Sequence, residues 1–284
     1  GRDMRASRPV LYLLILLVAT VLVMVAVLRP TVFPGLVESE PVEVEEETPE
    51  VAPKVTPPDT GPRLYLVLDD AGQSLAHLAA FEDFPAPFTL AVLPRLPDSR
   101  AVAQRATRLG HEVILHQPME PLGDHDPGPG AILVGHTDRE IQEILTENLN
   151  NVPGVVGVNN HMGSRATGDP GVMATVSRSL AGRQLYFLDS RTTAETVALK
   201  MVRAAGVPAA ARDTFLDNIR DEQAISRQLD VALAHADLHG WSVMIGHVTS
   251  PELAQVLIDR YPALAAAGYR FLPLSDLMKR DQGQ

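Results

Sequence analysis

Short apolar runs alternate with longer amphipathic segments along residues 63–284. Continuous apolar runs are typical of strands buried on both faces of a parallel sheet, whereas apolar positions that recur every three to four residues indicate helices. The runs predict strands at 63–69, 88–93, 112–116, 155–158, 185–188, 242–246 and 270–272, with 207–210 as a further candidate. The segments between them predict helices near 75–82, 98–109, 138–150, 170–182, 194–205, 221–239 and 251–267.

This order of elements predicts an α/β domain with a parallel sheet. Seven or eight βα units fit a closed or partly closed barrel better than an open sheet, and an open doubly wound sheet is the alternative. The residues after the first strand, AGQS at 71–74, match neither a P-loop nor a dinucleotide-binding fingerprint. The sequence therefore gives no indication of nucleotide binding.

A charge-free apolar segment, Val10 to Leu28, precedes the predicted domain. At about 1.5 Å per residue, such a helix spans a hydrocarbon core of roughly 30 Å. Arg2, Arg5 and Arg8 precede the segment, so the positive-inside rule assigns residues 1–9 to the cytoplasm and the rest of the chain to the other side. We expect an uncleaved signal anchor. A cleaved signal peptide is the alternative, but its apolar region would be shorter and would end in a small-x-small site.

Residues 29–62 are acidic and rich in proline, with little apolar periodicity. Like-charge repulsion and proline favour an extended, disordered linker. The whole chain has a net charge of −11 and no cysteine. The acidic charge argues against binding to nucleic acid or anionic lipid surfaces, and the lack of cysteine excludes disulfides and suits an oxidising compartment.

Two aspartates, Asp69 and Asp70, end the first predicted strand. The carboxyl ends of parallel strands are where the active sites of α/β folds are built. Adjacent carboxylates repel one another unless a cation or a shared proton relieves them, which favours a metal ligand beside a general base. A helix N-cap followed by a solvated aspartate is the alternative.

Other predicted strands also end in polar residues, among them His116, His161, Asp189 and His247. One carboxylate and two neutral imidazoles form the ligand set of a hydrolytic zinc site with a position open for water. Asp70, His116 and His161 could supply that set. In the hydrolysis that it predicts, Asp69 takes a proton from the attacking water and His247 donates one to the departing nitrogen.

Two other classes of function fit the same residues. The domain could be a non-catalytic glycan- or protein-binding module of a cell-envelope complex, or a metallohydrolase that acts on another amide or an ester. The presence of both Asp69 and His247 favours catalysis, because recognition does not require an acid and a base. The remaining histidines fall in predicted helices or polar loops and are assigned no chemistry: His77, His111, His125, His136, His235 and His239.

Six motifs occur in order between Leu64 and Leu277: LDDAG, LHQPME, GVNNHMGS, FLDSRT, RDTFLDN and IGH. In these motifs the chain resembles the divergent polysaccharide deacetylases, a branch of the superfamily that also contains chitin and peptidoglycan deacetylases. The resemblance implies a distorted (β/α) barrel of seven to eight parallel strands and a divalent metal ion, with Zn²⁺ as the first choice. It also implies hydrolysis of N-acetyl groups on an envelope amino-sugar polymer.

The resemblance also implies roles for individual residues. Asp69 matches the general base, and Asp70 matches a metal ligand. His116 and His161 fall at the metal-histidine motifs, and His247 resembles the histidine that protonates the leaving amine. Backbone N–H groups near Met162 and Gly163 could hold the oxyanion, since glycine permits close approach.

The chain departs from the better-studied deacetylases at two motifs. Those enzymes have two histidines four residues apart after the third strand, whereas His116 is followed at that spacing by Glu120. Either His161 completes the metal site, which we prefer, or Glu120 does. Their arginine-proline motif is missing, with NNHMGS in its place. The other candidates for binding substrate or supporting the catalytic groups are Asn160, Met162, Gly163, Asp189, Arg212 and Asp217.

Asp189 and Asp217 could support a histidine or Arg212, or could be helix caps or surface ion pairs.

Taken together, the predictions describe a single-pass protein of the bacterial inner membrane with its catalytic domain in the periplasm. The expected partners are an N-acetylated glycan, the membrane through the N-terminal helix, and other envelope proteins, with no nucleic acid.

Overall fold

The computed structural model describes residues 61–281. The predicted transmembrane segment, Val10 to Leu28, and nearly all of the predicted linker lie outside these residues. Within the described part of the chain, no helix has the length and apolar character that a membrane span requires. The fold below is therefore that of the predicted catalytic domain.

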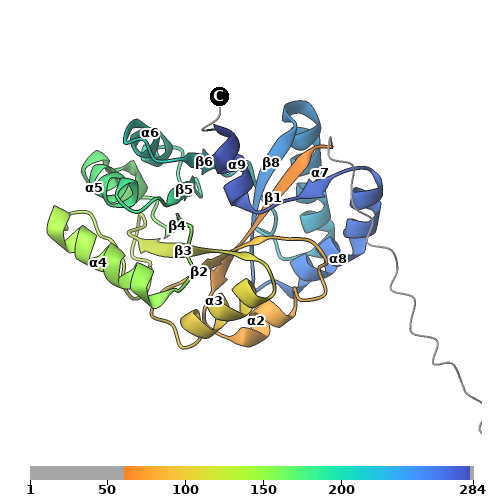
Figure 1. The fold of residues 1–284 in the computed structure, drawn as a ribbon, viewed down its shortest axis with the longest axis horizontal. Helices are drawn as coiled ribbons and strands as arrows, with labels where there is room; N and C mark the ends of the chain where they lie inside the picture. Colours follow the sequence, from red (N-terminus) through yellow and green to blue (C-terminus); the bar gives the residue numbers. More distant parts are fainter. Residues whose placement is uncertain (1–60, 282–284) are drawn as a thin grey trace, which may run out of the picture. The chain divides into compact units, whose positions relative to one another are not determined.

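Strands and helices alternate along the domain (Figure 1). The strands are β1 (Arg63–Ala71), β2 (Thr89–Val92), β3 (Glu112–Met119), β4 (Gly157–Met162), β5 (Tyr186–Asp189), β6 (Ala209–Ala211), β7 (Thr214–Phe215), β8 (Trp241–His247) and β9 (Arg270–Phe271). The α-helices are α2 (Leu75–Ala79), α3 (Ser99–Arg108), α4 (Asp138–Asn151), α5 (Pro170–Ala181), α6 (Ala198–Ala204), α7 (Glu222–His239), α8 (Pro251–Ala266) and α9 (Leu274–Asp281), and a short 3₁₀ helix, η1, covers Ala166–Gly168.

The strands form one parallel sheet in the order β6-β5-β4-β3-β2-β1-β8-β7, with β9 paired to β1. The sheet curls into a half-barrel with most of the helices on its outer side (Figure 1). β6 and β7 lie at its two ends and do not pair, although only Arg212 and Asp213 separate them in sequence. The predicted parallel (β/α) barrel is confirmed in this incompletely closed form.

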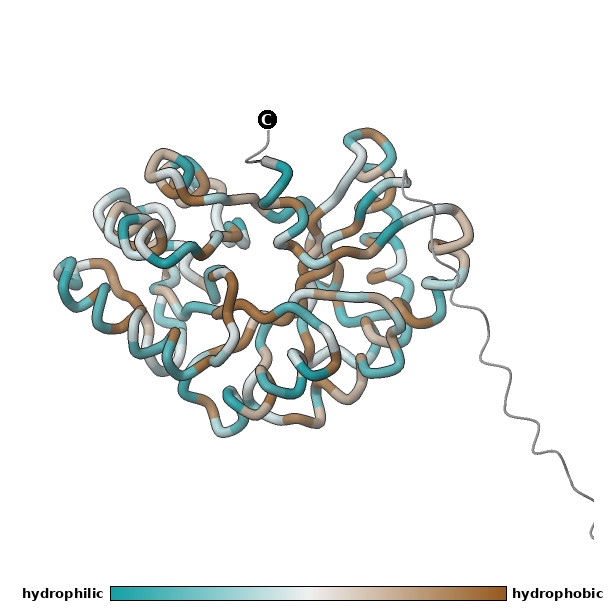
Figure 2. The backbone as a smooth tube through the Cα atoms, viewed as in Figure 1, coloured by the Kyte–Doolittle hydropathy of each residue, from teal (hydrophilic) through white to brown (hydrophobic). Residues whose placement is uncertain are grey.

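Alternating residues of each strand face two apolar layers. In β1, Leu64, Leu66 and Leu68 pack in the layer between the sheet and the outer helices, whereas Tyr65 and Val67 belong to the cluster inside the curl. Figure 2 shows mainly apolar residues along the central strands, and alternating hydrophilic and apolar residues along the outer helices. Because side chains alternate along a strand, the parity of a residue decides which layer it enters.

Helix α9 contributes to the inner layer. Its side chains Leu274, Leu277 and Met278 pack in the same cluster as Tyr65. The backbone N–H of Leu274 donates to Thr89 Oγ1 at 3.0 Å, which ties the start of the helix to β2. The terminal helix therefore covers part of the interior that the open sheet leaves unfilled.

Three elements were not predicted: α9, β7 and η1. A strand of two residues or a helix of two turns carries too few positions to show a period. Residues 61–281 therefore contain nine strands rather than the predicted seven to eight, because the two-residue strand β7 adds one to the eight candidates. The start signal at Thr137 is confirmed, because its side chain and that of Glu140 form a capping box at α4.

Replacing Gly157 by alanine should lower the free energy of unfolding by about 1–3 kcal/mol, the usual cost of overpacking. A Cβ atom there would lie 2.4 Å from the Tyr186 ring, and that ring is anchored by a 2.6 Å hydrogen bond from its hydroxyl to Glu112. Urea denaturation checks the prediction. The matched control is Gly182→Ala, where nothing lies within 4 Å of the added carbon and no loss of stability is expected. Equal stabilities of the two variants would contradict it.

Candidate metal centre and acid–base pair

Asp69 and Asp70 reach the same group of side chains although they are consecutive in β1. In a regular strand, consecutive side chains point to opposite faces. Asp70 has a left-handed backbone with φ of 65°, and the register between β1 and β2 shifts between Leu68 and Ala71. This β-bulge inserts an extra residue and re-aims the side chain that follows. It brings the Asp70 carboxylate to β3 and β4.

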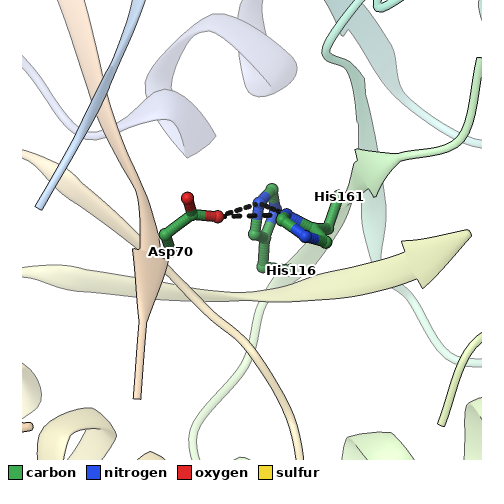
Figure 3. A group of neighbouring side chains, drawn as sticks. All are labelled: Asp70, His116 and His161. Atoms are coloured by element: carbon green, nitrogen blue, oxygen red, sulfur yellow. Dashed lines mark hydrogen bonds and ion pairs between the residues drawn. The ribbon is translucent and has the colours of Figure 1, made fainter. Parts of the chain in front are cut away.

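The Asp70 carboxylate meets two imidazoles (Figure 3). Its Oδ1 lies 3.2 Å from His116 Nε2 and 3.0 Å from His161 Nδ1, and the two nitrogens are 3.1 Å apart. His116 in β3 and His161 in β4 both occupy positions that face the inside of the half-barrel, and His161 lies across from Pro118 of β3. The structure therefore brings together the three residues that were predicted to bind metal.

The geometry of these three atoms fits a metal ion. A tetrahedral zinc site with bonds of about 2.0–2.1 Å has ligand atoms roughly 3.3–3.4 Å apart, close to the measured triangle. Asp70 Oδ1 is also buried and receives no well-aligned hydrogen bond, although two nitrogens lie near it. A buried carboxylate oxygen without a donor is costly, and a cation would supply the missing partner.

Asn159 sets the tautomer of His116. Its Nδ2 donates to Asp69 Oδ1 at 2.9 Å, so its Oδ1 faces His116 Nδ1 at 2.8 Å and accepts the proton of that nitrogen. A neutral His116 with its proton on Nδ1 has a lone pair on Nε2, the atom in the triangle. Asn159 therefore links the predicted base to a predicted ligand and prepares that ligand for a cation.

The two aspartates have opposite electrostatic environments. Burial raises the pKa of Asp69 above its usual value, and the nearby His116 offsets only part of that effect. Burial would also raise the pKa of Asp70, but the adjacent His116 and His161 outweigh it and hold the pKa well below its usual range. Asp70 is therefore a permanent anion, as a ligand must be, whereas Asp69 has the higher proton affinity that a base needs.

His247 and Asp217 form a second pair beside Asp69. His247 ends β8 and lies directly across from Asp69 in the β1–β8 register. Asp217, whose side chain is fully buried, lies 2.8 Å from His247 Nδ1 through one oxygen and accepts the backbone N–H of His247 through the other. Burial lowers the pKa of His247, but Asp217, Asp70 and Asp69 outweigh this and raise it to about 9. The imidazole is therefore charged at neutral pH.

The same arrangement of strands and motifs occurs in known proteins. The sequence model of the divergent polysaccharide deacetylases matches residues 66–278. The chain belongs to the divergent polysaccharide deacetylase family. The expected membership is thus confirmed, and the match includes all five residues of the metal and acid–base groups.

Two curated relatives and one crystal structure illustrate this membership. An uncharacterized protein of Haemophilus influenzae is 34% identical over 185 residues, covering 65% of this chain and 66% of that protein. The uncharacterized protein YibQ of Escherichia coli is 36% identical over 185 residues, covering 65% of this chain and 58% of YibQ. The matches thus span less than two thirds of both relatives. The crystal structure of the uncharacterized protein ATU2773 from Agrobacterium tumefaciens C58 has a TM-score of 0.74 and 25% identity, covering 78% of this chain and 93% of that one.

Glu120 does not join the metal group of this divergent polysaccharide deacetylase. Its Oε2 accepts the backbone N–H of Val134 at 2.5 Å, and its Oε1 accepts Arg165 Nη1 at 3.1 Å. The carboxylate therefore holds the loop after β3 in place. Of the two ligand sets left open by the sequence, the structure assembles the one with His161.

Asn160, Met162 and Gly163 shape the turn after β4. Asn160 Nδ2 donates to the Met162 carbonyl at 2.7 Å, and its Oδ1 accepts the backbone N–H of Ser190. Met162 and Gly163 both have left-handed backbones, with φ of 51° and 82°. These contacts fix the backbone beside His161; the predicted oxyanion contact stays a prediction.

Asp189 and Arg212 have partners other than those expected. The buried Asp189 carboxylate accepts the backbone N–H of Arg191 and the hydroxyl of Thr196, and within residues 61–281 it bonds to no histidine or arginine side chain. Arg212 stacks on Phe215, with its guanidinium carbon 3.9 Å from the ring centroid. Asp189 therefore organises the loop after β5, and the expected support of a histidine comes from Asp217.

Asn159 and Phe215 were not among the residues predicted for the site. Asn159 lies two residues before His161, so strand parity could have placed it on the same inner face. Phe215 is in the two-residue strand β7 and is nearly parallel to the His247 ring, with an interplanar angle of 11° and centroids 6.1 Å apart. No sequence pattern marks it, because β7 is too short to show alternation.

Replacing His161 by alanine should abolish stoichiometric zinc retention by the purified chain. Removal of a ligand should cost more than the about 10–100-fold loss of affinity that removal of a supporting residue causes. Zinc content after dialysis and competition with a chelating dye measure the effect. Glu120→Ala is the control and should retain zinc, because that carboxylate lies outside the triangle. Equal retention by the two variants would contradict the assignment.

Proposed function

We propose that this divergent polysaccharide deacetylase is a metal-dependent hydrolase that removes N-acetyl groups from an amino-sugar polymer of the bacterial envelope. One observation carries the proposal: a ligand triangle of Asp70, His116 and His161 lies beside two groups suited to act as base and acid. Asp69 lies 3.7 Å from His116 Nε2 through its Oδ2 and is paired in register with His247. A binding module needs no such pair.

Asp70 Oδ1, His116 Nε2 and His161 Nδ1 would hold the divalent metal, for which we propose zinc. When bound, such an ion acidifies a coordinated water and polarises the carbonyl of the acetyl group. The orphaned Asp70 oxygen and the tautomer of His116 support this choice of ligands. Glu120 has no part in it.

Asp69 is the proposed general base. Its burial raises its pKa, which brings its proton affinity closer to the working pH. Asn159 holds its Oδ1 by a 2.9 Å hydrogen bond, so Oδ2 is left to take the proton of the attacking water. The water oxygen then bonds to the carbonyl carbon of the acetyl group.

His247 is the proposed general acid. Asp217 lies at its Nδ1 and stabilises the imidazolium, which leaves the Nε2 proton for the amide nitrogen as the C–N bond breaks. The products are acetate and a free amine on the sugar. Because Asp69 and His247 are cross-strand neighbours, proton removal and proton donation occur on one short stretch of the half-barrel rim.

We also propose that the domain acts on the periplasmic side of the bacterial inner membrane. The apolar segment Val10 to Leu28 and the three arginines before it support an uncleaved anchor of that orientation. Such an anchor would keep the hydrolase close to envelope glycans and to other envelope proteins.

The purified chain should release acetate from N-acetylated oligosaccharides when zinc is added, and His247→Ala should slow release by about 10²–10⁴-fold, the usual effect of losing a general acid. An enzymatic acetate assay measures both. His239→Ala, at the end of α7, is the control and should leave the rate unchanged. Zinc binding without acetate release from any such oligosaccharide would favour the non-catalytic module instead.

Replacing Asp217 by asparagine should move the alkaline limb of the kcat/KM profile to lower pH. His247 must be protonated to donate, so activity is lost as pH rises through its pKa of about 9; without the Asp217 charge that pKa falls toward 6.5. The variant should therefore lose more activity at pH 8 than at pH 6. Asp230→Asn, an exposed position on α7, is the control. If the alkaline limb of the kcat/KM profile were the same in Asp217→Asn as in the unchanged protein, Asp217 would not have this role.

A further inference from the structure

Two arginines lie side by side at the open edge of the half-barrel. Arg191 follows β5 and Arg212 follows β6, and these strands pair in register up to Asp189 and Ala211. Arg212 donates from Nε to the Ser190 carbonyl at 2.8 Å and from Nη2 to the Arg191 carbonyl at 3.1 Å. The guanidinium of Arg212 is therefore fixed directly against the backbone of Arg191.

Neither arginine makes an ion pair with another side chain of residues 61–281. The two bonds of Arg212 go to neutral carbonyls, and the Arg191 side chain is exposed. The acids nearest in sequence are already engaged: Asp189 bonds to Thr196 and to the Arg191 N–H, and Asp213 accepts the backbone N–H of Val243. Three of the five N–H donors of Arg212 remain outside these two bonds.

The charges of the two arginines act on each other. Burial lowers the pKa of Arg212, and the charge of Arg191 lowers it further, although Asp189, Asp213 and Asp69 act in the opposite sense. Two neighbouring guanidinium groups that repel each other are stabilised by an anion that contacts both. The planar donors of arginine suit the oxygens of a carboxylate or a phosphate.

The backbone at Arg191 gives independent support. Arg191 has φ of 51°, a left-handed conformation that glycine adopts far more readily than arginine. The buried Asp189 imposes this turn through its bond to the Arg191 N–H. Strained backbone of this kind clusters at functional sites, which is consistent with a use for the exposed Arg191 side chain.

Phe215 connects this pair of arginines to the reacting groups. The guanidinium of Arg212 lies 3.9 Å from the Phe215 centroid, and the His247 ring is stacked nearly parallel to the same phenyl ring. An anion bound by Arg212 would thus lie one side chain away from the imidazole that protonates the leaving nitrogen. A substituent on the reacting sugar, or on its neighbour in the polymer, would be the group that carries this anion.

We propose that Arg191 and Arg212 recognise an anionic group of the glycan, a carboxylate or a phosphate, so that the substrate class is an acidic N-acetylated amino-sugar polymer. The inference rests on the proposed function for the identity of the glycan. The arginine pair would set where such a polymer binds.

The test compares N-acetylated oligosaccharides of equal length in binding to the zinc-loaded full chain by calorimetry. One carries a carboxylate on a lactyl ether, the second is its methyl ester, and the third carries a phosphate monoester. The carboxylate or phosphate form should bind at least about tenfold tighter than the ester, with a preference that weakens as salt is added. The stronger of the two anionic forms identifies the source of the charge.

Arg191→Gln and Arg212→Gln should each remove most of this preference, whereas Arg212→Lys should keep part of it. Arg108→Gln is the control, because that arginine is exposed at the end of α3 and should keep the full preference. Circular dichroism checks that each variant is folded. Because Arg191 is exposed, Arg191→Gln leaves the stacking of Arg212 on Phe215 intact. Equal binding of the anionic and ester forms, or an unchanged preference in Arg191→Gln, would overturn the proposal.

Acetate release separates this proposal from the proposed function. If the anionic form binds selectively and no acetate is released from it, the recognition site stands and the hydrolytic function fails. If acetate is released from the ester and the anionic forms with equal kcat/KM and equal affinity, the hydrolytic function stands and the recognition site fails.

Discussion

The candidate site depends on one backbone irregularity, the bulge at Asp70. Without it, strand alternation would send Asp69 and Asp70 to opposite faces of the sheet, and one carboxylate would enter the apolar layer under the helices. The left-handed φ of 65° at Asp70 instead directs its carboxylate to the inner rim, beside that of Asp69. Asp is among the residues that tolerate this conformation best, so the sequence supplies both the ligand and the means of aiming it.

The bulge also allows two neighbouring carboxylates to differ in chemistry. Asp70 is half-buried beside two imidazoles that favour its charged form, whereas Asp69 is buried with a single amide donor and a more distant histidine. Asn159 connects the two environments, because one amide group donates to Asp69 and accepts from His116. A change at Asn159 would therefore disturb the base and a metal ligand together.

Much of this arrangement follows from the sequence. Apolar runs in the sequence predicted the longer strands. Because His116, His161 and His247 follow the carboxyl ends of such strands, and these ends meet at one rim of a parallel sheet, the sequence also predicted that the three histidines lie on that rim. The bulge at Asp70 could not be predicted, because it arises from the register of β1 against β2. The capture of Glu120 by Val134 and Arg165, and the pairing of Asp217 with His247, depend on loop paths that no local pattern specifies.

Incomplete closure explains why the rim beyond β5 differs from the metal side. In a closed barrel the residues after β6 would continue into a ladder with the next strand, whereas here only Arg212 and Asp213 cross from β6 to β7. Asp213 replaces the missing ladder by bonding to the backbone of Val243 on β8. Arg212 follows the last paired residue of β6, and its side chain stacks on Phe215 of β7. The unpaired ends of the sheet thus carry a cationic side chain that Phe215 connects to the acid–base pair.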